Sequence, residues 1–103
     1  MKKTLLQEDW KELLFKTPNA VVLDVRTEDE CADGVIENAV CLDFFQKEKV
    51  LQEIEKMDKD KEYFVYCRSG NRSGMMCELL NSKGFKNTYN LKGGIMQWNG
   101  KLV

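Results

Sequence analysis

The residues with the clearest chemical potential form a short polar loop that begins at a cysteine. The loop runs through Cys67, Arg68, Ser69, Gly70, Asn71, Arg72 and Ser73. Gly and Asn tolerate left-handed backbone conformations, so the loop can turn successive N–H groups inward as an anion-binding nest. A helix after the loop would add free N–H groups and a positive dipole end, and the two arginines add formal charge.

These features all favour the thiolate of Cys67 over the thiol. A free cysteine has a pKa of ~8.5, and surroundings of this kind lower it to roughly 3.5–7.5. The same loop would hold a persulfide anion once one formed on Cys67. The competing interpretation is that Cys67 only packs at the end of a strand, as many free cysteines do. A packing cysteine, however, has no need of two arginines and a turn.

The chain contains no histidine. This excludes Cys–His dyads, Ser–His–Asp triads and His-ligated metal sites. Any reactive cysteine must therefore be activated by backbone amides, a helix end or arginines. We expect no cofactor and no metal.

Charge balance and hydropathy limit the classes of partner. Sixteen basic and seventeen acidic residues nearly cancel, so no strong affinity for nucleic acid or for a membrane is expected. No h-region follows the N-terminus, and no stretch approaches roughly 18 apolar residues. We therefore expect one cytoplasmic domain over residues 1–103.

Short apolar runs alternate with helical periodicity, which predicts an α/β fold. Strands are expected at residues 20–25, 39–42, 63–66 and 87–91. Helices are expected at residues 7–16, 48–57 and 73–83, with short ones from the capping box at 27–30 to about 34, and after 93–94 through 98. In the helix over 73–83, Met75 and Met76 are expected to face inward. Cys67 then lies at the carboxyl end of a strand, where open α/β sheets bind ligands.

Four segments in order resemble the motifs of the rhodanese family, at residues 23–27, 34–39, 67–73 and 91–98. The chain is similar to a rhodanese domain over nearly its whole length. It departs from the pattern in the second segment, where Val35 replaces the usual histidine and Glu37-Asn38 the usual Pro-Gly. The resemblance implies a three-layer α/β sandwich of about five mostly parallel strands with helices on both faces.

The resemblance also implies a sulfurtransferase that works by two displacements. The Cys67 thiolate would attack the sulfane sulfur of thiosulfate, a polysulfide or glutathione persulfide and keep it as a persulfide. Cyanide, a small thiol or a protein cysteine would then remove the sulfur. Backbone amides from Arg68 to Arg72 would stabilise the persulfide, and the two arginines would attract an anionic donor.

Asp24 and Arg26 end another strand and are expected to support the loop. The favoured interpretation is a structural hydrogen-bond anchor, and the alternative is an ion pair between Asp24 and a loop arginine. Cys31, Cys41 and Cys77 are expected to pack. A disulfide framework is not expected, because no Cys-x-x-C pair and no secretory signal occur.

Three other functions remain open. Cysteine phosphatases and arsenate reductases use Cys-x5-Arg, whereas Arg72 follows Cys67 after four intervening residues and Ser73 occupies the position that this pattern requires. The shorter loop should fit a sulfur better than a phosphate. A second alternative is a catalytically weak binding or regulatory module. In the third, a redox relay, Cys31 or Cys41 would serve as a resolving thiol at the loop mouth.

Overall fold

A parallel sheet forms the centre of the molecule. The computed structural model describes residues 2–103, so Met1, the start of the expected domain, lies outside the described residues. The sheet has five strands, and every neighbouring pair in it is parallel. In spatial order these are β1 (Lys2–Leu5), β5 (Asn87–Leu91), β4 (Glu62–Tyr66), β2 (Ala20–Asp24) and β3 (Val40–Cys41).

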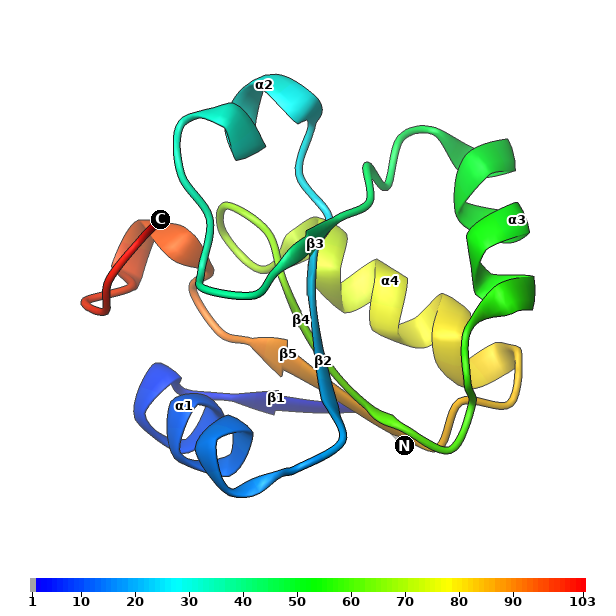
Figure 1. Ribbon diagram of the computed structural model, residues 1–103, viewed down its shortest axis with the longest axis horizontal. Coiled ribbons are helices and arrows are strands. Elements are labelled where there is room, and N and C mark those ends of the chain that lie inside the picture. The colour runs from blue at the N-terminus through cyan, green and yellow to red at the C-terminus, as the bar shows by residue number, and fades with distance from the viewer. Residues whose placement is uncertain (1) are drawn as a thin grey trace.

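Helices cover both faces of this sheet. On one face lie α1 (Gln7–Lys16) and the 3-10 helix η1 (Ile95–Gln97), and on the other lie α3 (Lys47–Lys56) and α4 (Asn71–Ser82). The short helix α2 (Glu28–Ala32) follows β2 and lies near the loop between β4 and α4 (Figure 1). The three-layer α/β sandwich expected from the sequence is confirmed.

The central strand β4 supplies side chains to both layers of the core. Tyr63 and Val65 pack against α3 and α4, whereas Phe64 and Tyr66 pack on the α1 side. Burial of side chains of this size contributes roughly 1.5–3 kcal/mol each relative to exposure. A strand buried on both faces needs an unbroken apolar run, which is why residues 63–66 lack the alternation of a half-exposed strand.

Most element ends lie within one or two residues of the expected bounds, and three differences are informative. Strand β1 was not predicted, because an edge strand can be short and polar and gives little hydropathy signal. Helix α4 begins at Asn71, two residues before the expected start. Met75 is 49% exposed, so the prediction that it faces inward is wrong. The buried side chains of α4 recur at residues 73, 76, 77 and 80, and Met75 lies off that face.

Cys31 and Cys41 form a disulfide, which corrects the expectation that both only pack. Strand β3 pairs with β2 so that Cys41 lies opposite Asp24, at the end of the sheet from which the chain enters α2. The two cysteines meet because of this pairing, which spacing along the chain does not reveal. A cross-link that closes a loop of this size contributes about 2–3 kcal/mol to the free energy of unfolding in the chain-entropy description.

The turn at residues 93–94 packs directly on the backbone that leads into the Cys67 loop. The N–H groups of Ile95 and Met96 donate to the carbonyl oxygens of Cys67 and Arg68, at 2.9 and 3.0 Å. Gly94 has φ +62°, and a Cβ there would lie 2.3 Å from the Arg68 carbonyl oxygen. Only glycine therefore allows this close approach of the two backbones.

We predict that Gly94→Ala lowers the free energy of unfolding by about 2–4 kcal/mol, because it adds both backbone strain and a clash with main-chain atoms. Gly84→Ala is the matched control. Gly84 also has a positive φ, +95°, but a Cβ there meets only the flexible end of Lys59, at 3.6 Å. That variant should lose about 1 kcal/mol. Urea denaturation measures both, and equal losses would contradict the role assigned to the close approach.

Candidate active site

Cys67 follows the last residue of β4, and its sulfur lies under the loop that leads into α4. Cys67 is 1% exposed. The N–H of Gly70 donates to the Cys67 Sγ at 3.0 Å, and the hydroxyl of Ser73 lies 3.3 Å from the same atom. Gly70 adopts φ +106° at the start of α4, the left-handed conformation that turns its N–H toward the sulfur. The loop therefore surrounds the sulfur with donors.

The pKa of the Cys67 thiol is lowered. Burial raises the pKa, but hydrogen bonds from the Ser73 side chain and from the backbone N–H groups of Ser73, Gly70 and Ser69 together outweigh it. These bonds favour the thiolate because the anion accepts hydrogen bonds much more strongly than the neutral thiol does. Activation without histidine thus comes from the loop amides and one hydroxyl. The pKa of Arg72 is raised by hydrogen bonds to a carboxylate and also by the charge of the thiolate, so Arg72 and the thiolate attract each other.

Asn90, on β5, orients the loop from the neighbouring strand. Its Nδ2 donates to the carbonyl oxygen of Gly70 at 3.2 Å, which leaves its Oδ1 to accept from the Ser73 hydroxyl. Ser73 has one hydroxyl proton and two acceptors, the Cys67 sulfur and the Asn90 oxygen. Sequence reasoning missed Asn90. The one signal in the sequence was a polar amide between Tyr89 and Leu91, near the end of a predicted strand, and the structure buries this amide.

Arg72 is paired with an acidic residue from α2. Its Nη1 and Nη2 donate to the two carboxylate oxygens of Glu30, at 2.7 and 3.1 Å. Hydrogen bonds from Arg72 lower the pKa of Glu30 to about 2, with a smaller contribution from the Thr27 N–H and some opposition from burial. Glu30 therefore stays ionised at neutral pH and balances the charge of Arg72. The sequence indicated Glu30 only as part of a capping box, which is also present.

Arg68, in contrast, is exposed. None of the ion pairs among the described residues includes it. The two loop arginines, equivalent in the sequence, therefore have different surroundings. Arg68 is the cation available to an anion in solution.

Asp24 and Arg26 lie at the end of β2, the strand beside β4. Asp24 accepts from the Arg26 guanidinium at 2.6 and 2.9 Å, and both residues are buried. Arg26 also donates to the Gly34 carbonyl oxygen at 2.7 Å. Asp24 is therefore paired with Arg26 and forms no ion pair with a loop arginine. Through the Gly34 carbonyl oxygen, Arg26 also holds the segment after α2.

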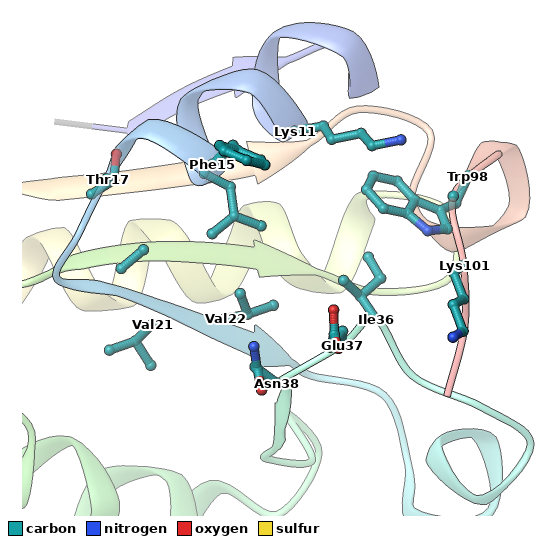
Figure 2. A pocket seen from close by; sticks show the side chains of 13 residues that line it. Lys11, Phe15, Thr17, Val21, Val22, Ile36, Glu37, Asn38, Trp98 and Lys101 are labelled. Atoms are coloured by element: carbon teal, nitrogen blue, oxygen red, sulfur yellow. The ribbon is translucent and has the colours of Figure 1, made fainter.

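A cleft of about 650 Å³ lies elsewhere (Figure 2). It opens on the α1 side of the sheet, with Lys11, Phe15 and Trp98 at its border and Lys101 near Trp98. No residue of the 67–73 loop lines it. The hydrogen-bond donors converge on the Cys67 sulfur and not on this cleft, which makes the loop the candidate site.

Within residues 2–103, no group of three or more His, Cys, Asp and Glu side chains is arranged to hold a metal ion. No helix there is long and apolar enough to cross a membrane.

The fold and the loop together define a class of protein, a small α/β sandwich that presents an activated cysteine at the carboxyl end of its central strand. The family model of the rhodanese-like domain matches residues 6–101. The chain therefore belongs to the rhodanese-like domain family.

Individual relatives agree with this assignment. The chain is 40% identical to YtwF of Bacillus subtilis, provisionally named a sulfurtransferase, over 88% of this chain and 84% of that protein. It is 36% identical to the thiosulfate sulfurtransferase GlpE of Coxiella burnetii, over 88% and 80%. The crystal structure of a rhodanese-like domain protein from Staphylococcus aureus superposes with a TM-score of 0.84, at 26% identity over 98% and 96% of the two chains.

Some relatives carry another name. A tRNA uridine(34) hydroxylase of Protochlamydia amoebophila is 37% identical, but this chain spans only 34% of that protein.

We predict that Ser73→Ala raises the pKa of Cys67, because the variant lacks the hydroxyl that lies beside the sulfur. The rate of alkylation of Cys67 by iodoacetamide, followed against pH, should have its midpoint at a higher pH than in the wild type. Ser69→Ala is the control, since Ser69 acts through its backbone N–H, which the substitution retains. An unchanged midpoint in Ser73→Ala would show that the hydroxyl does not stabilise the thiolate.

Proposed function

We propose that this protein is a sulfurtransferase that carries sulfur as a persulfide on Cys67. The observation that carries the proposal is the set of hydrogen-bond donors around the Cys67 sulfur, from Gly70 and Ser73. Donors aimed at a buried sulfur stabilise the thiolate, and the N–H groups of the same loop would stabilise a persulfide, whose charge lies one atom further out.

In the first displacement, the Cys67 thiolate attacks the sulfane sulfur of thiosulfate. A new S–S bond forms to Cys67, the S–S bond of thiosulfate breaks, and sulfite leaves with its electron pair. In the second displacement, cyanide or a thiolate attacks the outer sulfur of the persulfide, forming thiocyanate or a new persulfide and restoring the Cys67 thiolate. This scheme is covalent catalysis with ping-pong kinetics, and no proton transfer to a histidine is needed.

The charged residues in and around the loop have different proposed roles. Arg68, exposed and outside the ion pairs of the described residues, attracts an anionic donor. Arg72 holds α2 against the start of α4 through Glu30. Asp24 and Arg26 support the loop indirectly, by fixing the segment after α2. Thiosulfate, a polysulfide or glutathione persulfide is the proposed donor, and cyanide, a small thiol or a protein thiol the acceptor.

We further predict a single domain over residues 1–103, a cytoplasmic location, and no nucleic-acid or membrane partner. A binding module without turnover is the nearest alternative. The lowered pKa of Cys67 argues against it, because a binding module has no need of a thiolate.

Intact-mass spectrometry after incubation with thiosulfate tests the central step. The wild type should gain one sulfur, about 32 Da, on Cys67. Cys67→Ser should fold and gain nothing. Cys77→Ser is the control, because Cys77 is the other cysteine outside the Cys31–Cys41 disulfide and is buried on α4 in the core, and that variant should load like the wild type. A sulfur gain in Cys67→Ser would place the chemistry on another residue.

The same protein should show negligible hydrolysis of aryl phosphates. The loop has one residue fewer between Cys67 and Arg72 than a phosphatase loop, and Arg72 is already held by Glu30. A continuous assay with p-nitrophenyl phosphate measures this. Turnover that depends on Cys67 would favour phosphoryl transfer over sulfur transfer.

A further inference from the structure

The helix that carries Cys31 also carries the carboxylate that pairs with Arg72. Cys31 in α2 is bonded to Cys41 at the end of β3, and the preceding residue, Glu30, contacts Arg72 of α4. Arg72 lies close enough to Cys67 that the charge of the thiolate affects it. A path of contacts therefore joins the disulfide to the candidate active site.

We propose that Cys31 and Cys41 form a redox-sensitive site that regulates the affinity of the Cys67 loop for anionic sulfur donors. The closed disulfide holds Glu30 on Arg72 and neutralises its charge, and opening the disulfide frees Arg72 to attract the donor. This inference rests on the proposed function, since it concerns the regulation of the same site.

Helix α2 depends on few attachments, which makes its position sensitive to the disulfide. The helix has five residues and none of them is buried. Its capping box, between Thr27 and Glu30, is internal to the helix end and does not fix it to the sheet. The Glu30–Arg72 pair and the disulfide are what join the helix itself to α4 and β3. Arg26, bound to Asp24 and to the Gly34 carbonyl oxygen, holds the chain on both sides of α2. Without the covalent tie, the short helix between these points can shift and loosen the contact of Glu30 with Arg72.

The disulfide is placed where exchange can reach it. Cys41 is exposed and Cys31 is half-buried. A low-molecular-weight dithiol can attack one sulfur, displace the other as a thiolate and then leave as its own cyclic disulfide, so that Cys31 and Cys41 gain two electrons and two protons. A low-molecular-weight disulfide reverses the reaction. In a reducing compartment the pair would be open except under oxidising conditions.

The expected consequence is electrostatic. In the closed state the carboxylate of Glu30 lies between α2 and the loop and cancels the charge of Arg72, so Arg68 alone attracts an anion. In the open state two guanidinium groups face the approach to Cys67. The contribution of one partly exposed charge interaction corresponds to about a two- to five-fold change in the reaction rate of an anion.

The experiment compares two alkylating agents that differ in charge, the anion iodoacetate and neutral iodoacetamide. The quantity measured is the rate of the reaction of Cys67 with iodoacetate divided by its rate with iodoacetamide, obtained on the Cys67 peptide by mass spectrometry. This ratio reports the local charge independently of sulfur transfer. The closed wild type is compared with the Cys31→Ser/Cys41→Ser variant, which cannot close, and with the wild type opened by dithiothreitol, which serves if the double variant does not fold. The ratio should rise about two- to five-fold on opening, and less at high salt.

Glu30→Gln separates the charge of α2 from its position. Glutamine preserves the capping box but removes the charge that neutralises Arg72. The ratio should be raised already in the closed state of this variant and should change little on opening. Glu28→Gln is the matched control, because Glu28 is an exposed carboxylate on the same helix, and it should behave like the wild type.

Three results would overturn the proposal: an equal ratio in the closed and open states, full redox dependence in Glu30→Gln, or a disulfide that dithiothreitol opens only in denaturant. Failure of the proposed function is a separate result. If Cys67 gains no sulfur from thiosulfate, the sulfurtransferase assignment fails whatever the alkylation ratio. If Cys67 gains sulfur but the ratio does not respond to the disulfide, only the regulation fails.

Discussion

The central constraint on this structure is the need to keep a sulfur anion buried without an imidazole. Burial alone would raise the pKa of Cys67, since desolvation disfavours the thiolate. The N–H of Gly70 and the hydroxyl of Ser73 offset that cost, but only while the loop keeps its conformation. The neighbouring elements therefore act mainly as supports for one short loop. The left-handed Gly70, the Asn90 amide and the close backbone contact at Gly94 all serve this purpose.

Parallel topology brings these supports together. Because all strands run the same way, their carboxyl ends meet at one edge of the sheet. Cys67 follows β4, Asn90 lies near the end of β5, and Asp24 ends β2. Residues separated by dozens of positions in the chain thus become neighbours. The same edge is where α2 and β3 meet, so the disulfide lies near the loop because of the topology and not because of any local sequence signal.

Local signals predicted most of this architecture, and non-local contacts account for what was missed. The apolar run at 20–25, the capping box at Thr27 and the glycine and asparagine of the loop each act over a few residues, and each produced the expected element. Strand β1, the Cys31–Cys41 bond and the Glu30–Arg72 pair each depend on a partner distant in sequence. Met75 is exposed because the buried face of α4 passes through Ser73, Met76, Cys77 and Leu80, and helical spacing places Met75 on the opposite side.

Residue type alone did not distinguish the roles of the two arginines in the loop. Both add the same formal charge to the sequence, yet Arg72 forms an ion pair with Glu30, whereas Arg68 is exposed and belongs to none of the ion pairs among the described residues. The lowered pKa of Cys67 arises mainly from neutral hydrogen-bond donors, whereas Arg72 interacts with the thiolate through charge. The groups that contribute most to stabilising the thiolate are therefore not the ones that attract an anionic donor. Because the neutral donors belong to the loop and not to α2, the charge near Cys67 can change while the nucleophile is kept, which is the physical condition that regulation through α2 requires.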